Sequence, residues 1–352
     1  MAFKTYYHVI PSFNTGIYLF AVLISAGVRY SSKTPDTIQI AIPAKVFSSV
    51  IVDDNNVKWF ITEAGIVSFD GEKWKLHGDN AMIPKENLKS IAYGSGTSGS
   101  GLWISTPDGA SVVKLPVNQD TETKTYSPDN SPILSRNVLS ISAGKNPVRW
   151  FATDKGISAL RNEKWLTVYY ELTYPFSMFE AFPVTSMGTS PSGDSLYAGT
   201  KGAGVIRVYR NETDAISGAS VYSKWGPIIL PSDTIYSVFI APDGAQWFGT
   251  DQGVARHTGN KTLENWKIFT VEHGLADNLV RAITSDSDGR VWFGTRKGIS
   301  VYNGSSITSF TMKDGLNSNN VLCIAADRDG VIWIGTDNGV NSIKNDVFLG
   351  YK

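Results

Sequence analysis

Short apolar runs alternate with polar turn sequences from about residue 47 to the end of the chain. The runs are four to six residues long and rich in Val, Ile, Phe, Trp and Thr, which is too short for helices and typical of β-strands. Pairs such as Asp288-Gly289, Asp329-Gly330 and Asn303-Gly304 separate the runs and are typical of tight hairpin turns. The pattern therefore predicts a protein built almost wholly of antiparallel strands.

One phrase recurs through these runs: an aromatic residue, two apolar or small residues, Thr, two variable residues and then Gly. The copy that starts at Tyr197 has one further residue before its Gly. The mean spacing is about 46 residues, and self-similarity at such a period indicates a repeat architecture. Four short strands in each of seven repeats predict an all-β fold, a seven-bladed β-propeller of four-stranded antiparallel blades. The copies start at Trp59, Trp103, Trp150, Tyr197, Trp247, Trp292 and Trp333.

The repeated phrase is expected to serve packing rather than chemistry. In an extended strand, Trp292 and Gly294 face one side of the sheet while Phe293 and Thr295 face the other. Both sides are largely apolar, so both must be covered, as happens when each blade lies between two neighbours. A large Trp beside a small Gly lets adjacent twisted sheets interlock.

The N-terminal segment stands apart from the repeats. Gly16–Val28 is an apolar run that is shorter than a membrane span of about 20 residues and fits the core of a signal peptide. Small residues at Ser25, Ala26 and Gly27 suit a cleavage site. We therefore expect residues 1–28 to be a signal peptide or a short N-terminal anchor, the mature chain to have no transmembrane domain, and the protein to be periplasmic or secreted.

The remaining chain divides in two. Residues 29–46 are expected to form a linker with a candidate extra strand, because Ile38, Ile40 and Ile42 alternate with other residues. Residues 47–352 are expected to form the propeller, and the seventh repeat has its own fourth strand near residues 347–351.

Composition narrows the classes of partner. The 352 residues include 32 basic and 32 acidic side chains, for a formal net charge of zero, which gives no electrostatic reason to expect nucleic acid. Cys323 is the one cysteine, so the chain can form no internal disulfide and no cysteine-based metal site. We expect it to be a small buried hydrophobic residue.

The repeat frame resembles a known family. Both "VRAITSDSDGRVWFGTRKG" and "VLCIAADRDGVIWIGTDNG" follow V-x-x-I-x-x-D-x-D-G-x-[VI]-W-[FI]-G-T-x-x-G, and "HGLADNLV" and "DGLNSNNV" precede them as connectors. These words resemble the bacterial two-component regulator propeller repeat. The resemblance runs from Phe47 to the C-terminus and is strongest in the last three blades. It implies an exported ligand- or partner-binding propeller of the sensor type, here stand-alone and without a kinase part.

Candidate ligand-binding residues follow from the propeller fold, because function in propellers lies on loops around the central channel. The two variable residues after each repeated Thr lie on such loops and are mixed in charge. They either hydrogen-bond a sugar or peptide or are merely solvated. The candidates among them are Glu63, Asp154, Lys155, Lys201, Asp251, Arg296, Lys297 and Asp337.

The segment from Trp165 to Pro183 departs most from the repeat. It replaces a polar connector with aromatic residues, of which Tyr170, Tyr174 and Phe176 are further ligand-binding candidates. Such a segment is either a contact platform for a sugar ring or partner chain, or a loop that packs on its own apolar side chains.

The sequence offers little for catalysis, and we expect no catalytic residue, no cofactor and no metal site. The words Asp286-x-Asp288-Gly and Asp327-x-Asp329-Gly resemble the start of a calcium loop but lack its distal Glu, so hairpin turns explain them. "WFITEAG" at Trp59 is similar to words in the streptogramin lyases, seven-bladed propellers that use a His base and a metal. The one set that fits such an enzyme is His273, also a ligand-binding candidate, with Glu63 or Asp337.

We therefore expect a non-enzymatic, exported binding module, acting as a monomer on a glycan or peptide ligand or a protein partner. The alternatives are a streptogramin-lyase-like, metal-assisted lyase and a structural cell-surface interaction protein.

Overall fold

The computed structural model describes residues 42–77, 83, 86–94, 100–117, 121–143, 148–166, 182–210, 216–225, 230–259 and 265–352. The expectations for residues 1–28, for the linker up to residue 41 and for Tyr170, Tyr174 and Phe176 lie outside these residues. Within the described ranges, no helix is long and apolar enough to cross a membrane.

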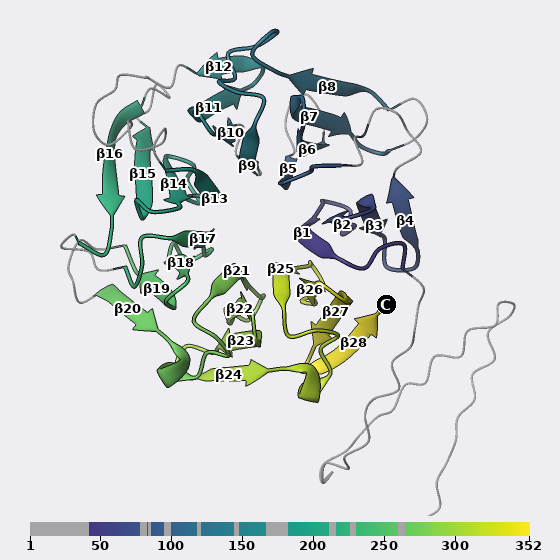
Figure 1. The fold of residues 1–352 in the computed structure, drawn as a ribbon, viewed down its shortest axis with the longest axis vertical. Helices are drawn as coiled ribbons and strands as arrows, with labels where there is room; N and C mark the ends of the chain where they lie inside the picture. The colour runs from purple at the N-terminus through teal and green to yellow at the C-terminus, as the bar shows by residue number, and fades with distance from the viewer. Residues whose placement is uncertain are drawn as a thin grey trace, which may run out of the picture. The chain divides into compact units, whose positions relative to one another are not determined.

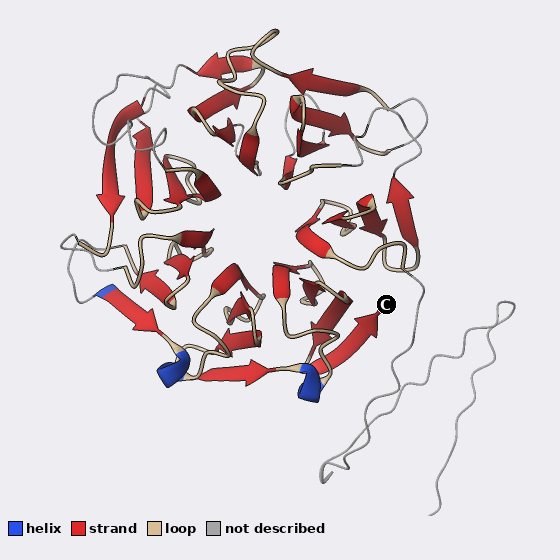
Figure 2. Ribbon diagram, in the orientation of Figure 1, coloured by secondary structure: helices blue, strands red, loops and turns tan. Residues whose placement is uncertain are grey.

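Seven four-stranded antiparallel sheets make up the described chain, and they follow one another around a ring (Figures 1 and 2). The predicted all-β, seven-bladed propeller is confirmed. The first strand of each blade lies next to the central opening and the fourth lies at the rim (Figure 1). Short 3₁₀ turns follow the fourth strands of blades five and six (Figure 2).

The strands are short and regular, as the apolar runs predicted. Blades one to three contain β1 (Phe47–Val52), β2 (Lys58–Thr62), β3 (Gly65–Phe69) and β4 (Trp74–His77); β5 (Ile91–Gly94), β6 (Gly101–Thr106), β7 (Gly109–Lys114) and β8 (Thr123–Tyr126); and β9 (Val138–Ser142), β10 (Val148–Thr153), β11 (Gly156–Arg161) and β12 (Lys164–Leu166). Blades four and five contain β13 (Val184–Thr189), β14 (Ser195–Thr200), β15 (Val205–Arg210) and β16 (Ile216–Tyr222); and β17 (Ile235–Ile240), β18 (Gln246–Thr250), β19 (Val254–His257) and β20 (Trp266–Phe269), followed by η2 (Val271–His273). Blades six and seven contain β21 (Val280–Ser285), β22 (Val291–Thr295), β23 (Gly298–Tyr302) and β24 (Ile307–Phe310), followed by η3 (Met312–Asp314); and β25 (Val321–Ala326), β26 (Ile332–Thr336), β27 (Gly339–Lys344) and β28 (Val347–Tyr351).

Because the strands are antiparallel, the start of the first strand, the turn after the repeated Thr and the connector to the next blade lie on the same side of each sheet. We call this side the T-x-x-G face. In blade six, for example, Val280 pairs with Thr295, which in turn pairs with Gly298. The Asp-Gly turns between first and second strands lie on the opposite face.

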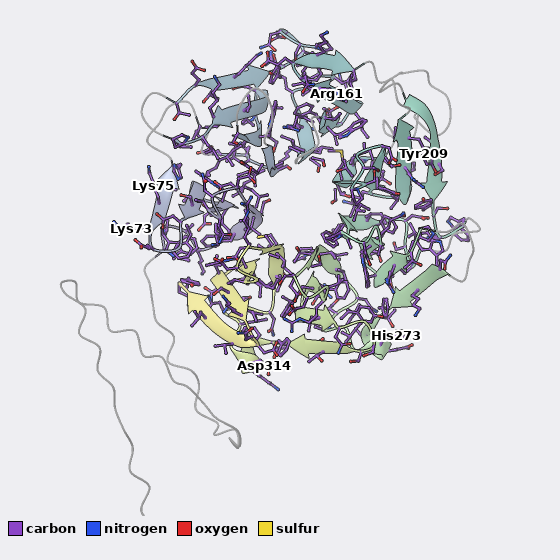
Figure 3. All side chains as sticks on the ribbon, turned by 180° about the vertical axis from the view of Figure 1, so that it is seen from behind. Lys73, Lys75, Arg161, Tyr209, His273 and Asp314 are labelled. Carbon is purple, nitrogen blue, oxygen red and sulfur yellow. The ribbon has the colours of Figure 1, made fainter. Side chains whose placement is uncertain are left out.

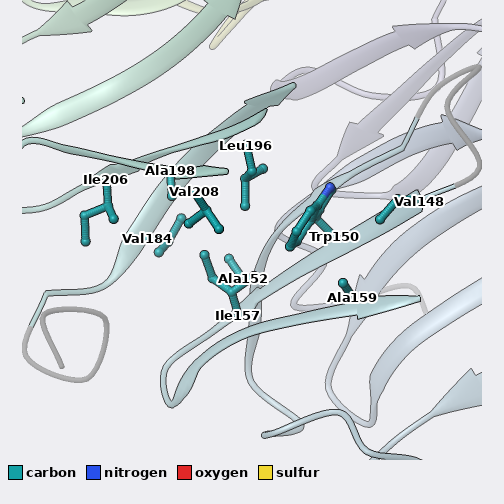
Figure 4. Close-up of a cluster of buried hydrophobic side chains, with 10 residues drawn as sticks. All are labelled: Val148, Trp150, Ala152, Ile157, Ala159, Val184, Leu196, Ala198, Ile206 and Val208. Atoms are coloured by element: carbon teal, nitrogen blue, oxygen red, sulfur yellow. The ribbon is translucent and has the colours of Figure 1, made fainter. Parts of the chain in front are cut away.

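The hydrophobic core is divided into seven clusters, one between each pair of neighbouring blades. Figure 4 shows the cluster between blades three and four, where Trp150 and Ile157 meet Val184 and Leu196. Alternate residues of one strand therefore serve two clusters, which confirms that the repeated phrase is packing.

The Gly of this phrase is required by the neighbouring blade. A Cβ atom added to Gly294 would lie 2.7 Å from Val321 Cγ1 and 2.9 Å from Ile324 Cδ1, both in the first strand of blade seven. Real side chains do not approach so closely, so the phrase needs a residue without a side chain where the next blade rests.

The first Asp of each D-x-D-G sequence accepts hydrogen bonds both from the backbone of the hairpin turn and from a Trp side chain. Asp286 Oδ1 accepts hydrogen bonds from the backbone N–H groups of Asp288 and Arg290, and its Oδ2 accepts from Trp292 Nε1 at 2.8 Å. Asp53 with Trp59 and Asp327 with Trp333 repeat this bond, each at 2.9 Å. The predicted hairpin turns are confirmed.

Across the described ranges, no group of three or more His, Cys, Asp or Glu side chains is placed to hold a metal ion.

Blade seven meets blade one to close the ring. Its four strands all come from the last repeat, as predicted from the sequence, so closure depends on side chains and turns rather than on strand exchange. Lys58 Nζ lies 3.0 Å from Asp327 Oδ2, with side chains only 4% and 1% exposed. On the T-x-x-G face, Gly339 N–H donates to Lys45 O at 2.7 Å.

Cys323 is buried as expected, and burial raises the pKa of its thiol to about 12.

Trp292→Ala should destabilise the protein by about 3–5 kcal/mol, because it removes a large side chain that is 1% exposed and leaves a cavity between blades six and seven. Arg296→Ala, on an exposed turn of the same blade, should change the unfolding free energy by about 0–1 kcal/mol. Urea titration of both variants measures the difference, and the reverse order would contradict the packing assignment.

Asp327→Asn should cost about 3–5 kcal/mol, because it leaves the buried Lys58 ammonium without its carboxylate. The matched control is Arg328→Gln, which removes an exposed ion pair with Asp54 at the same junction and should cost about 0–1 kcal/mol.

The same pair predicts a pH dependence. Burial alone raises the pKa of Asp327, but hydrogen bonds from Trp333 and Val331 and the charge of Lys58 outweigh it and hold the pKa below its usual value. The stabilisation is therefore complete above the unfolded-state pKa of about 3.9 and is lost as pH falls below it. Urea midpoints at pH 7 and pH 3 should differ more for the native chain than for Asp327→Asn. An equal difference would show that the acid-sensitive group lies elsewhere.

Candidate functional site

The repeated Thr closes the turn that carries the candidate residues. In blade six, the Thr295 hydroxyl donates to Gly298 O at 2.7 Å and accepts from the Lys297 backbone N–H at 3.2 Å. Thr295 is fully buried, and Gly298 has a φ of 136°, a conformation that favours glycine. The two variable residues, Arg296 and Lys297, are exposed as a result.

Asp154 is held by the connector that leads into its own blade. Asn137 Nδ2 donates to Asp154 Oδ2 at 3.0 Å. Partial burial raises the pKa of Asp154, but hydrogen bonds from Ser135 and Asn137 outweigh it and keep the pKa below its usual value. The carboxylate is therefore ionised at neutral pH, and part of its acceptor capacity is already used.

Asp337 repeats this arrangement in blade seven. Asn320 Nδ2 donates to Asp337 Oδ2 at 2.8 Å. Burial raises the pKa of Asp337, but hydrogen bonds from Ser318 and Asn320, together with the charge of Lys45, lower it below the usual value. Two of the predicted acidic residues thus share one local structure on different blades.

The other two acidic candidates differ from this pair. Glu63 accepts the backbone N–H groups of Lys45 and Val46, at 2.6 and 2.7 Å, and so fixes the entry into the first blade. Asp251 is half-buried, and within the described part of the chain its buried Oδ1 has no hydrogen-bond partner. Asp251 is therefore the candidate carboxylate with an acceptor left open.

The basic candidates are all exposed. Lys155 and Lys201 extend from the turns of blades three and four. Arg296 Nη2 and Lys297 Nζ lie 3.6 and 3.5 Å from Asp277 Oδ2, a buried carboxylate in the connector before blade six. The predicted residues of the repeated turns therefore all lie on the T-x-x-G face, but they are spread over blades one and three to seven.

A second set of residues lies closer to the opening, and sequence reasoning missed it. In six blades, the pairing register between the first and second strands shifts by one residue next to the T-x-x-G face. This shift leaves one residue of the first strand without a partner in the second strand. Such a β-bulge turns a side chain away from the regular alternation. In blade two Lys89 takes this place, with its backbone N–H bonded to Ser105 Oγ. We call these residues the inner ring: Ser48, Lys89, Leu139, Thr185, Tyr236, Arg281 and Leu322.

Two inner-ring cations reach across to the next blade. Lys89 Nζ donates to Asn137 Oδ1 and Arg281 Nη1 donates to Asn320 Oδ1, both at 2.5 Å. The same Asn residues hold Asp154 and Asp337. Each junction therefore contains a cation, an amide and a carboxylate in series, formed by two blades.

A sequence signal for the inner ring exists. In two repeats a basic residue, Lys89 or Arg281, directly follows the apolar residue that opens the blade (Leu88 or Val280), where a strand between two blades should be apolar or small. A basic residue at a position that is expected to be apolar or small therefore indicates a side chain that does not pack between two blades.

His273 lies at the outer rim of the ring (Figure 3), away from the opening. Its Nδ1 accepts from the Thr270 backbone N–H at 3.2 Å and lies 3.0 Å from the Thr270 hydroxyl oxygen, which caps η2. Asp314, also at the rim, caps η3 in the same way through Thr311. His273 therefore acts as a local cap and does not meet Glu63 or Asp337, which lie in blades one and seven.

The other described histidines are buried inside blades. His77 Nε2 lies 2.7 Å from Ser68 Oγ, and burial, with a smaller effect of Lys75, lowers the pKa of His77 to about 4. His257 Nδ1 lies 3.1 Å from Gln246 Oε1, and its ring stacks on Trp266. Neither is presented on the T-x-x-G face.

The comparisons with known proteins agree with this architecture. The two-component regulator propeller family matches residues 274–297 and 315–338, which carry the connector, first strand and repeated phrase of blades six and seven. No curated protein matches the sequence.

Several solved structures are similar in fold. One is the extracellular domain of a protein assigned to the hybrid two-component systems of B. thetaiotaomicron, with 20% identity and a TM-score of 0.67 over 87% of this chain. A streptogramin B lyase has 15% identity and a TM-score of 0.61, over 87% of this chain and 96% of that one. A catalytically inactive virginiamycin B lyase from Staphylococcus aureus with quinupristin has 15% identity and a TM-score of 0.53, over 90% of this chain and 87% of that one.

Identities this low establish the fold alone, and the chain spans only 40% of the B. thetaiotaomicron domain. The family match is more specific, because it falls on the connector and phrase that set the T-x-x-G face. This chain is therefore a seven-bladed propeller whose last two blades carry the two-component regulator propeller repeat.

Proposed function

We propose that this protein is an exported, non-enzymatic binding module of the sensor type, which binds a glycan or peptide ligand, or a protein partner, on its T-x-x-G face. The observation that carries the proposal is the pair of cation–amide–carboxylate series at the junctions of blades two and three and of blades six and seven. Side chains fixed before a ligand arrives lose little conformational freedom on binding, which favours recognition.

Export is supported by two independent features. The apolar run Gly16–Val28 fits a signal peptide, and the B. thetaiotaomicron structure of similar fold is an extracellular domain. A periplasmic or secreted propeller meets extracellular sugars, peptides and surface proteins.

A lyase is the main alternative, since two lyases share the fold. A general base must reach its substrate, whereas His273 caps a turn at the rim and its Nδ1 is engaged by Thr270. Asp154 and Asp337 have lowered pKa values, the opposite of what a general acid needs at neutral pH. These features favour binding over catalysis.

The proposal is tested with glycan and peptide arrays probed with the full chain. The variant Lys155→Glu, Lys297→Glu reverses two exposed charges on the T-x-x-G face and should weaken any specific binding at least about tenfold, because a charge contact becomes a repulsion. The matched control Lys73→Glu, Lys344→Glu reverses two exposed charges on the opposite face and should bind normally.

The outcomes separate three classes of function. Loss of binding in the first variant alone supports the proposed face. Equal loss in both variants, or loss in the control alone, contradicts it. No binding to either array points to a structural surface protein. The variant Tyr170→Ala, Tyr174→Ala tests the aromatic segment separately: unchanged binding removes it as a platform.

His273→Asp should leave both binding and stability unchanged, because Asp caps the equivalent turn at Asp314. His273→Ala should lower the unfolding free energy by about 0.5–1 kcal/mol through the lost cap. Urea unfolding and array binding of the two variants check this. A large loss of binding or of a lyase activity in His273→Asp would favour the lyase instead.

A further inference from the structure

The outermost strand of blade seven, β28, has an exposed apolar face. Val347, Leu349 and Tyr351 lie on one side of this strand, because alternate residues of a strand point to the same face. Tyr351 is buried in the cluster between blades seven and one, whereas Leu349 is 50% exposed and Val347 is 62% exposed. This face therefore continues the core between the two blades out to the rim, where it is open to solvent.

The other six blades show that this apolar face is an exception. Leu349 pairs with Ser342, which pairs with the repeated aromatic residue Trp333, and the same count identifies the equivalent position in every blade. Five of the six equivalents of Leu349 are polar, and none of the equivalents of Val347 is apolar with a side chain. The equivalents of Leu349 are Lys75, Lys124, Leu166, Ser220, Lys267 and Thr308, and those of Val347 are Lys73, Glu122, Lys164, Gly218, Asn265 and Ser306. Blade seven alone combines two large exposed apolar side chains on this face, which favours a surface that is covered.

The chain enters blade one beside the end of this strand. Gly339 N–H donates to Lys45 O at 2.7 Å, and a Cβ atom added to Gly339 would lie 2.3 Å from Tyr351 O. Lys45 is therefore close to the C-terminal end of β28. Ile42 and Ala44 pack against the same cluster as Tyr351. The residues that precede Ile42 thus start from the buried end of the exposed apolar face.

The sequence before Ile42 matches this face in pattern and in length. Ile38, Ile40 and Ile42 alternate as the apolar residues of β28 do, and no charged residue occurs between positions 37 and 44. Six extended residues reach about 20 Å, whereas the four steps from one end of β28 to the other cover about 13 Å.

We propose that residues 36–41, which lie outside the described ranges, pack along the exposed face of β28. Ile40 covers Leu349 and Ile38 covers Val347. The chain ahead of blade one then holds the outermost strand of blade seven, in addition to the contacts that close the ring between the two blades. This role is independent of any ligand on the T-x-x-G face.

The size of the face favours a segment of the same chain over a second copy of the protein. Two aliphatic side chains supply only a small part of the roughly 800 Å² per partner that a stable protein–protein interface buries. A segment tethered at Ile42 needs no such area, because the tether gives it a high effective concentration at β28.

The proposal is tested by cross-linking in the full chain. The variant Ile40→Cys, Leu349→Cys should be linked within one chain by a short bismaleimide at neutral pH, and mass spectrometry identifies the linked peptides. The matched control is Ile40→Cys, Thr308→Cys, which places the second cysteine at the equivalent position of blade six and should link at least about tenfold more slowly. Both variants retain Cys323, which is buried.

Urea unfolding provides a second measurement. Leu349→Lys introduces the residue type that blades one, two and five carry at this position, and it should lower the urea midpoint if Ile38 and Ile40 cover the site. Ile38→Ser, Ile40→Ser should lower the midpoint as well. The combined variant should lose less than the sum of the two effects, because both remove the same contact. Thr308→Lys should leave the midpoint unchanged and should be additive with Ile38→Ser, Ile40→Ser.

Equal linking rates at positions 349 and 308, or fully additive midpoints for Leu349→Lys with Ile38→Ser, Ile40→Ser, would overturn the proposal. Links found only between two chains would overturn it too, because a second copy would then cover β28. Neither measurement involves a ligand, so failure of the proposed function would leave this result unaffected.

Discussion

A four-stranded blade of this protein has two apolar faces, so it is stable only when a neighbour covers each of them. This requirement determines the rest of the structure. It fixes the alternation of Trp292 and Phe293 toward different clusters, and it requires a Gly at position 294 where the next blade rests. It also makes the ring closed, because an open end would expose one apolar face. The buried ion pair Lys58–Asp327 and the turn contacts beside it occur where the chain has to join its first blade to its last.

The same requirement can be met by different local interactions. Blades one, six and seven satisfy the buried indole N–H with an Asp from the hairpin below. Blade five has Ala241 at the corresponding position, and within the described part of the chain Trp247 Nε1 is buried without a partner. There the Arg256 guanidinium lies 5.4 Å from the Trp247 ring centroid, a cation–π contact. Packing volume is thus kept in every blade, while the polar group that accompanies it varies.

Repetition explains how much of the fold could be predicted from the sequence. The strands, the blade number and the hairpin turns each follow from a residue pattern that recurs, so several repeats support the same prediction. The roles of Asp286 and Thr295 in hydrogen bonding were not predicted, because identical spacing is also consistent with solvated turns. The placement of His273 was not predictable, because the Thr270 cap that holds it at the rim depends on the path of the connector.

The candidate site was the least predictable part, for a physical reason. Asp154 and Asp337 were found because they follow the repeated Thr, but their partners Asn137 and Asn320 come from the connectors, and Lys89 and Arg281 come from the adjacent blades. The Asn–Asp contacts lie within one repeat, but the contacts of Lys89 and Arg281 form only when consecutive blades pack side by side, so no spacing within one repeat encodes those two contacts.

The β-bulge separates the packing between blades from the side chains at one position of the innermost strands. In six blades it removes one residue of the innermost strand from the interlocking of blades, so that this position is not constrained to be apolar or small. Lys89, Thr185, Tyr236 and Arg281 are very different side chains, yet each occupies this position without disturbing the clusters behind it. A fold whose packing demands near-identical repeats can therefore still carry side chains of different size, charge and polarity at this one position of its blades.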